Sequence, residues 1–366
     1  MKAIVVATPG KAGLVRDRAR PALRDDYLLV RTVAVALNPT DWKHAELTQT
    51  PGVLLGCDYA GVVDEVGPRV AKAFKKGDRV MGFAHGGNAA QPEDGAFAEH
   101  IVVKGDLQAR VPDGMSFEEA ATFGVGITSV GQGLYQTLGL PLPGAEPGAD
   151  PGADPGAEPV AEPVAETRGR RGPILIYGGS TATGILGLQF ARLSGYAPLT
   201  TCSPHNFDLV AEYGAAEAFD YGDDDAAADM RASTSDGLGL CWDTVSTAWT
   251  AGFCARALSS EGGRLATLLP LTSPRARVEC ADTMAYTVFG EDWAMGSRSF
   301  AARTDDFEFG KTWWTLVEGL LRQGRIRPHR IEVGTGGLQG VLEGLDRLRD
   351  SRVSGHKLVY RVGETP

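Results

Sequence analysis

The strongest constraint on the fold is an apolar run that leads through a glycine-rich turn into a helix. Pro173–Tyr177 (PILIY) has the composition of a buried strand, residues 178–184 read GGSTATG, and an apolar helical pattern covers about residues 184–194. Such a turn aims backbone N–H groups and the positive helix end at an anion, typically a pyrophosphate. Thr181 and Thr183 stand where glycine or alanine is usual, so the fingerprint is a loose one. On this motif alone, a turn that binds no ligand stays open.

The residues after this turn alternate between strand and helix patterns. Strands are predicted at residues 197–202, 218–220, 240–243 and 264–269, with helices at 207–213 and 250–259. This rhythm predicts an α/β domain whose parallel sheet is covered on both faces.

The remainder of the chain is mostly β. Short runs bounded by Gly, Pro or Asp predict strands at residues 3–7, 27–36, 61–66, 79–82 and 98–103. Helical patterns occur at 116–123, where Ser116 and Glu119 form a capping box, and around 129–138. Two amphipathic helices, at about 306–323 and 338–350, precede a last strand at 357–362.

A low-complexity stretch separates these two patterns. Residues 143–171 repeat Pro-small-Ala-acid and carry six carboxylates against three arginines, which gives −3 of the formal net charge of −10. Prolines at this spacing prevent a helix or a central strand, and nothing in the repeat is apolar enough to bury. We interpret it as a solvated insertion, with an acidic docking segment as the alternative.

Composition excludes several classes of protein. A net charge of −10 argues against a nucleic-acid partner, because phosphate backbones require a basic surface. No apolar run approaches the ~20 residues of a membrane-spanning helix. The five cysteines are scattered, which argues against a disulfide framework and fits the reducing cytoplasm.

The segment after the second predicted strand indicates the cofactor. In dinucleotide-binding folds a carboxylate at this place binds a ribose 2′-hydroxyl and would repel a 2′-phosphate. Residues 201–206 read TCSPHN and contain no acid but several hydrogen-bond donors. The sequence therefore favours NADPH over NADH, although Ser203 and Pro204 are also a plausible helix cap.

Several strings resemble the medium-chain dehydrogenase/reductase superfamily. They are NPTD (38–41), GCDYAG (56–61), KGDRV (76–80), GAFAE (95–99), GAAEAFDY (214–221) and GGR (262–264), in the family's order. A narrower set is similar to the trans-acting enoyl reductases that partner fungal highly reducing polyketide synthases: GGSTAT (178–183), LSGY (193–196), CSPHNFDL (202–209) and VFGE (288–291).

The resemblance implies a GroES-like, β-rich catalytic domain plus a Rossmann domain with a doubly wound parallel sheet. The expected ranges are 1–128 for the first part of the catalytic domain, 129–290 for the Rossmann domain and 291–366 for the return. Relatives that bind zinc carry a cysteine where this chain has Asn38, and a histidine where it has Cys57, so no metal is expected. His85 and His100 are interpreted as ordinary core or surface residues.

The activity implied is NADPH-dependent reduction of the α,β-double bond of a polyketide enoyl thioester held on an acyl carrier protein. The partner would be a highly reducing polyketide synthase, with no nucleic acid or membrane involved. Two alternatives stay open: a stand-alone quinone or alkenal reductase, and a nucleotide-binding protein without turnover.

The resemblance also places site residues. Lys43 is expected to orient the nicotinamide ribose or relay a proton, with a plain surface lysine as the alternative, and Ser129 to donate to the thioester oxygen. Cofactor contacts are expected at Thr40, Asp41, Trp42, Lys43, Ser180, Thr181, Ala182, Thr183, Ser203, Pro204, His205, Asn206, Tyr221, Leu268, Leu269, Ser354 and Gly355. A pure core role for Leu268 and Leu269 is equally compatible with the sequence. Substrate contacts are expected at Ser129, Val130, Gly131, Gln132, Gly133, Leu134, Tyr135, Gln136, Thr287, Val288, Phe289, Gly290 and Glu291.

Overall fold

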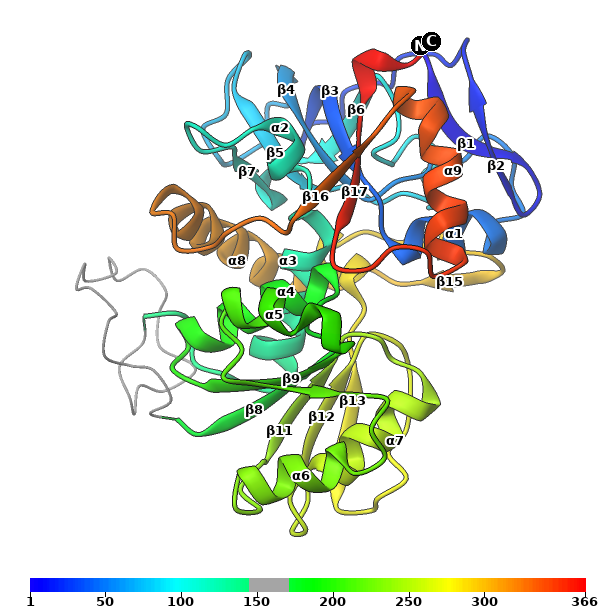
Figure 1. Cartoon of the computed structure of the whole chain (residues 1–366). Coiled ribbons are helices and arrows are strands. Elements are labelled where there is room, and N and C mark those ends of the chain that lie inside the picture. The colour runs from blue at the N-terminus through cyan, green and yellow to red at the C-terminus, as the bar shows by residue number, and fades with distance from the viewer. Residues whose placement is uncertain (145–170) are drawn as a thin grey trace. The chain divides into compact units, whose positions relative to one another are not determined.

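The computed structural model describes residues 1–144 and 171–366 of the chain (Figure 1). The predicted solvated insertion at 143–171 lies almost entirely outside the described residues. The described chain forms two compact units, one made of residues 1–128 and 286–366 and the other of residues 129–285. Residues 286–290, which the sequence prediction placed in the Rossmann domain, pack in the first unit, where Tyr286 and Phe289 stack on His85.

The second unit is built on a six-stranded sheet in which every pair is parallel. Its strand order is β10-β9-β8-β11-β12-β13. The strands are β8 (Pro173–Tyr177), β9 (Ala197–Cys202), β10 (Glu217–Asp220), β11 (Leu240–Asp243), β12 (Gly263–Thr267) and β13 (Val278–Asp282). The order reverses direction between β8 and β11, which is the doubly wound arrangement and confirms the predicted fold class.

Helices cover both faces of this sheet. Figure 1 shows α4 (Ala182–Leu193) and α5 (Phe207–Glu212) on one side, with α6 (Ala226–Ser233) and α7 (Ala248–Ala257) on the other. The apolar faces of α6 and α7 pack with β8 and β11 in one buried cluster that includes Leu175, Met230 and Phe253. The sequence did not predict α6 or the edge strand β13.

The predicted helix around 129–138 takes a different form. The chain there is the end of α3 (Gly124–Val130) followed by a π-helix, η2 (Gly131–Thr137). The predicted helix at 116–123 shortens to α2 (Phe117–Ala120), although its capping box forms, because Ser116 accepts the Glu119 N–H and Glu119 accepts the Ser116 N–H.

The first unit contains a seven-stranded sheet built from distant parts of the chain. Its main path is β16-β17-β3-β4-β5-β7, and β6 pairs with β3. The strands are β3 (Tyr27–Ala36), β4 (Asp58–Val66), β5 (Arg79–Phe83), β6 (His100–Lys104), β7 (Gln108–Arg110), β16 (Ile331–Gly334) and β17 (Lys357–Arg361). Antiparallel pairing of β17 with β3 ties residues 359–361 to residues 34–36.

The remaining elements of this unit surround the sheet. They are the hairpins β1 (Ala3–Thr8) with β2 (Lys11–Val15) and β14 (Trp293–Met295) with β15 (Arg298–Phe300), and the helices α1 (Pro39–Leu47), α8 (Thr304–Arg322) and α9 (Gly337–Arg349). Short 3₁₀ turns, η1 (Gly105–Leu107), η4 (Ala285–Phe289) and η5 (Val362–Glu364), complete the unit. The sequence did not predict β2, α1, β14, β15 or β16.

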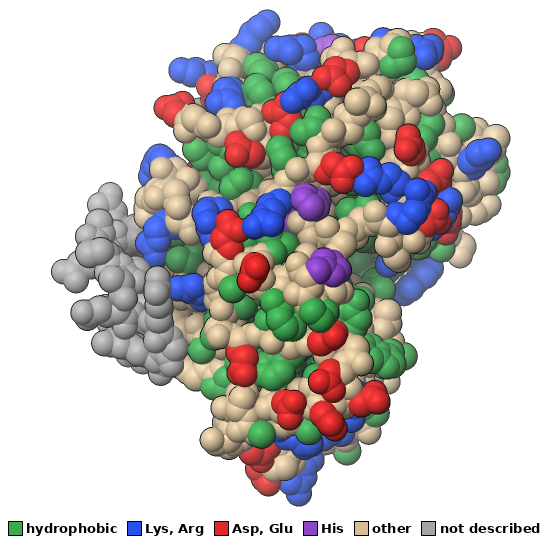
Figure 2. Space-filling model, in the orientation of Figure 1, with side chains coloured by type: hydrophobic (Ala, Val, Ile, Leu, Met, Phe, Trp, Pro, Cys, Tyr) green, Lys and Arg blue, Asp and Glu red, His purple; other side chains and the backbone are tan. Residues whose placement is uncertain are grey.

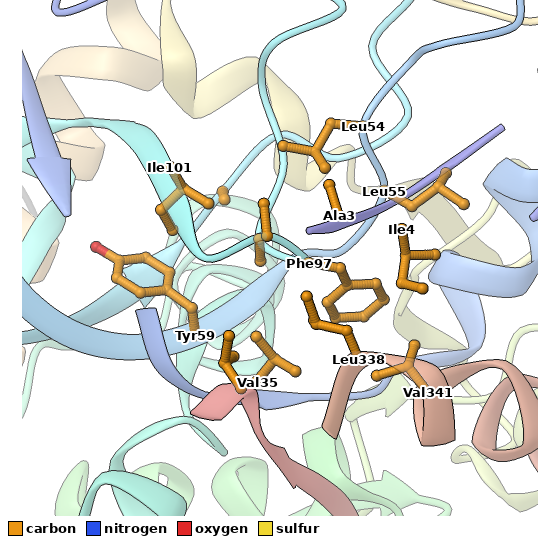
Figure 3. Packing of buried hydrophobic residues seen from close by; sticks show 14 of the residues in the cluster. Ala3, Ile4, Val35, Leu54, Leu55, Tyr59, Phe97, Ile101, Leu338 and Val341 are labelled. Atoms are coloured by element: carbon orange, nitrogen blue, oxygen red, sulfur yellow. The ribbon is translucent and has the colours of Figure 1, made fainter. Parts of the chain in front are cut away.

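The core of the first unit draws on residues from both of its chain segments. Figure 3 shows Phe97 among Ile4, Val35, Leu338 and Val341, all of them fully buried. Burying a side chain of this size contributes roughly 1.5–3 kcal/mol, so α9 is held in this unit by its apolar face.

The surface charge of the second unit gathers over one helix. Four exposed aspartates, Asp223, Asp224, Asp225 and Asp229, lie at or just before the start of α6, and Figure 2 shows acidic side chains crowding this part of the molecule. Acids near a helix N-terminus stabilise the helix and repel polyanions. Within the described residues, no helix combines the length and the apolar character needed to cross a membrane.

Candidate functional site

The glycine-rich turn of the second unit is built for close backbone approach. Gly178 follows β8 with a left-handed φ of 78°, and Thr181 caps α4 by accepting the Gly184 N–H at 2.9 Å. A Cβ on Gly184 would lie 2.2 Å from the Gly178 carbonyl oxygen, so only glycine lets the helix start directly against the strand end. The turn therefore presents N–H groups and a helix N-terminus at the carboxyl edge of the sheet.

Two threonines that were not among the predicted contacts support this turn. Thr201, in β9, accepts the Gly178 N–H at 3.0 Å. Thr244, directly after β11, donates to the Tyr177 carbonyl at 2.7 Å and lies 3.0 Å from the Thr181 hydroxyl. The signal was their position at or just beyond the ends of strands that neighbour β8, where ligands bind in doubly wound sheets.

The segment after β9, predicted to favour NADPH, lies next to another predicted cofactor residue, Tyr221. Ser203 follows β9, residues 204–206 form a 3₁₀ turn, and the Ser203 and Tyr221 hydroxyls are 2.9 Å apart. Tyr221 is 42% exposed. The alternative role of Ser203 and Pro204 as a cap is met in position, because Ser203 is the N-cap of this turn and Pro204 its first residue, but the Ser203 hydroxyl makes no cap hydrogen bond among the described residues.

Leu268 and Leu269 lie just past the end of β12. The Leu268 N–H donates to the Ser246 hydroxyl at 2.7 Å, which joins the loops after β11 and β12. Leu269 is 40% exposed, so a pure core role is wrong for this residue.

The predicted substrate stretch 129–136 is largely interior to the second unit. A Cβ on Gly133 would lie 2.4 Å from the Trp242 indole nitrogen, and the Tyr135 hydroxyl is 2.8 Å from that of Ser194. These two residues pack against the Rossmann core. Ser129, at the end of α3, is 7% exposed.

In the first unit, the predicted segment Thr40–Lys43 forms the first turns of α1. The Asn38 N–H donates to Asp41 Oδ2 at 2.7 Å, which fixes the start of the helix. Lys43 is half-buried, its Nζ lies 5.6 Å from the centre of the Trp42 ring, and burial lowers its pKa. A lowered pKa fits a proton-transfer role better than a fully exposed lysine would.

A buried polar cluster lies against α1. The Thr40 hydroxyl is 2.8 Å from the Tyr286 hydroxyl, which is itself 3.6 Å from Cys57 Sγ. Burial raises the pKa of Asp41 to about 7, and burial together with Asp41 raises the pKa of the Cys57 thiol. The thiol therefore stays protonated.

Tyr286 is enclosed by rings. Its ring stacks on His85 with centroids 4.6 Å apart and lies 5.1–5.4 Å from His44, Phe83 and Trp293. Burial lowers the pKa of His44 to about 4 and that of His85 well below its usual value, so both imidazoles are neutral. Sequence reasoning missed His44 and Tyr286, although Tyr286 directly precedes the predicted substrate segment.

Other predicted residues have structural partners. Glu291 accepts from Lys104 Nζ and from the Tyr27 hydroxyl, at 2.5 and 2.8 Å. Phe289 stacks on His85. Ser354 and Gly355 lie in the loop before β17. The structure thus gathers Phe289 with the aromatic rings around Tyr286 and ties Glu291 into an ion pair.

Next to α1, a buried ion pair joins β17 to β4. Lys357 Nζ is 2.9 Å from Asp58 Oδ2, and the two side chains are 3% and 0% exposed. The same ammonium donates to Asn38 Oδ1, and Asp58 Oδ1 accepts the Val125 N–H at 2.6 Å. Asn38, which stands where a zinc-ligating cysteine was expected in relatives, is thus bonded to this ion pair. Among the described residues, no cluster of three His, Cys, Asp or Glu side chains is placed to hold a metal ion.

Comparisons with known proteins agree with this architecture. Residues 24–113 match the alcohol dehydrogenase GroES-like domain. A crystal structure of an alcohol dehydrogenase superfamily protein from Novosphingobium aromaticivorans superposes with a TM-score of 0.76, at 21% identity, over 99% of both chains. A GroES-like unit combined with a Rossmann unit defines the medium-chain dehydrogenases/reductases, oxidoreductases that use a nicotinamide cofactor.

Curated relatives give the family. The trans-enoyl reductase resD of Aspergillus sclerotiorum is 56% identical over 99% of this chain and 100% of its own length. The trans-enoyl reductase TOXD of Cochliobolus carbonum is 53% identical over 79% of this chain and 91% of its own. The chain belongs to the fungal trans-enoyl reductases, which confirms the resemblance recognised in its sequence.

Proposed function

We propose that this protein reduces the α,β-double bond of an enoyl thioester carried on the acyl carrier domain of a highly reducing polyketide synthase, with NADPH as the reductant. The observation that carries the proposal is the identity of 56% to a trans-enoyl reductase over essentially the whole chain. The name trans-enoyl reductase, which its relatives carry, supports a substrate held by a separate partner synthase. Five free cysteines fit a reducing, cytoplasmic location.

The turn after β8 fits a dinucleotide. The start of α4 lies so close to Gly178 that a Cβ on Gly184 would clash, which is the close helix–strand packing of dinucleotide-binding turns and supports a diphosphate at the helix start. Ser203 and Tyr221 offer hydroxyls where a 2′-phosphate would lie, in a segment that has no carboxylate from 201 to 206. These features favour NADPH over NADH.

When bound, the nicotinamide supplies the hydride that adds to the β-carbon of the enoyl group. The residues of this chain then have two tasks. Hydroxyl donors, with Ser129 as the candidate, would stabilise the negative charge that develops on the thioester oxygen. Lys43, whose pKa burial lowers, would orient the nicotinamide ribose or pass a proton.

The test is NADPH oxidation with a crotonyl thioester compared with a free quinone, each repeated with NADH. We expect faster turnover of the thioester and a preference for NADPH. Faster turnover of the quinone would support a stand-alone quinone reductase instead. NADPH binding without turnover of either substrate would indicate a binding protein.

A further inference from the structure

The phenol of Tyr286 lies within hydrogen-bond distance of two groups, and in each contact either partner could be the donor. Its single proton has two possible acceptors, the Thr40 oxygen at 2.8 Å and the Cys57 sulfur at 3.6 Å. Sulfur is a weak acceptor and the oxygen contact is much shorter, which favours a phenol proton directed at Thr40. Burial keeps the pKa of Tyr286 well above its usual value, and the phenol remains a donor at all working pH values.

The tautomer of the His44 imidazole is fixed by its contact with the backbone. Its Nδ1 lies 2.6 Å from the Gly86 carbonyl oxygen, which only accepts, so Nδ1 carries the proton. Nε2 is then an acceptor, 3.5 Å from the Thr40 hydroxyl. This distance is at the outer limit of a hydrogen bond, so the Thr40 hydroxyl would donate instead to a closer acceptor.

The three hydrogen-bonding residues differ in their exposure to solvent. Tyr286 and His44 are 6% and 3% exposed, whereas Thr40 is only partly buried. The ring of Tyr286 is held by His44, Phe83, His85 and Trp293, so its hydroxyl has little freedom to move. A rigid interior phenol thus supports a residue that is itself only partly buried.

We propose that Tyr286 is a positioning residue for the reduction: it donates to Thr40 Oγ1 and thereby directs the Thr40 proton toward an oxygen of the bound cofactor or substrate. Thr40 would make this contact as a donor, with His44 Nε2 as its resting acceptor. A hydroxyl that already accepts a hydrogen bond is a stronger donor, because bonds in a chain polarise one another. The inference rests on the proposed function and adds a residue to it.

The first test is Tyr286→Phe, which keeps the packed ring and removes only the hydroxyl. With a crotonyl thioester we expect kcat to fall about tenfold, the effect of one hydrogen bond worth ~1.4 kcal/mol. KM and the NADPH Kd, measured by fluorescence titration, should change less than about threefold. The matched control is Tyr59→Phe, which deletes another buried hydroxyl, bonded at 2.8 Å to Gln108 in the same unit. Equal kcat losses in the two variants would overturn the inference.

The second test is a double-mutant cycle with Thr40→Val, and with Thr40→Ser as the rescue variant. If Tyr286 acts through Thr40, the double variant is no slower than Thr40→Val, and Thr40→Ser retains the sensitivity to Tyr286→Phe. Losses in kcat that multiply would overturn the inference.

Unfolding in urea tests the interaction between Tyr286 and Thr40 without measuring activity. The double variant should unfold at the same urea concentration as the less stable single variant. Additive shifts would overturn the pairing. A wild-type protein that reduces no thioester would overturn the proposed function, and the unfolding cycle would still decide whether Tyr286 and Thr40 are coupled.

Discussion

Asp41 makes the stability of the first unit depend on pH, in a direction opposite to that of most carboxylates. Its side chain is fully buried at the start of α1, and burial raises its pKa from 3.8 to about 7. The folded state therefore keeps a proton that the unfolded chain releases. Between the two pKa values the unfolded state binds fewer protons, so the free energy of unfolding falls as pH rises through this window.

The magnitude follows from the shift. About three pKa units correspond to ~4 kcal/mol, of which about 3 kcal/mol is lost between roughly pH 4.5 and 7.5. Asp41→Asn keeps a neutral side chain at every pH. The free energy of unfolding of the variant, relative to that of wild type, should therefore rise by about 3 kcal/mol across this pH range. This change is expected whatever the difference between the two proteins at the acidic end.

The assay is urea unfolding of both proteins at several pH values, followed by tryptophan fluorescence. The matched control is Asp113→Asn, at an exposed turn. The free energy of unfolding of this variant should differ from that of wild type by the same amount at every pH. The difference in the free energy of unfolding between wild type and Asp41→Asn could instead be the same at every pH. That result would show that the carboxyl is already ionised in the folded protein, and the argument from burial would fail.

Four further outcomes are expected. Lys43→Ala should leave the NADPH Kd within about tenfold (1.4 kcal/mol) and strongly lower turnover; unchanged turnover removes Lys43 from the site. Ser203→Asp should shift the ratio of NADPH to NADH affinity toward NADH by placing a carboxylate near the 2′-phosphate, and an unaltered ratio contradicts the assignment. Gly184→Ala should weaken NADPH binding and lower the melting temperature, because its Cβ meets the Gly178 oxygen; a variant with wild-type affinity would show that the helix start need not lie so close. Lys357→Met should cost about 3–5 kcal/mol by leaving Asp58 buried and unpaired, whereas Arg347→Met at the half-exposed pair with Glu332 should cost under ~1 kcal/mol; similar losses in both would refute the reasoning.

Local signals predicted the Rossmann unit well. Continuous apolar runs such as PILIY gave its strands, because a strand covered on both faces has no polar side to alternate with. The glycine-rich turn is also a local signal, because its residue types follow from the close approach of helix and strand, although Thr244, which supports it, comes from a distant strand end.

The cluster around Thr40 was not predictable in the same way. Thr40 and Tyr286 are 246 residues apart, and nothing near either residue indicates the other. The segment 287–291 was recognised from its resemblance, yet the Tyr286 hydroxyl next to it was missed because only the tertiary fold brings it to α1. The π-helix at Gly131–Thr137 was also missed, since its apolar pattern is the same as that of an α-helix at this length.

The bond between Lys357 and Asp58 sets an order of events during synthesis. The ribosome adds Lys357 299 residues after Asp58, which at about 5–20 residues per second is a delay of roughly 15–60 s. Until then the interior carboxylate has no counter-ion and β3 lacks its neighbour β17, whereas residues 129–285 are contiguous and already complete. The contiguous unit can therefore be completed first, whereas the sheet of the GroES-like unit is completed only after β17 has been synthesised.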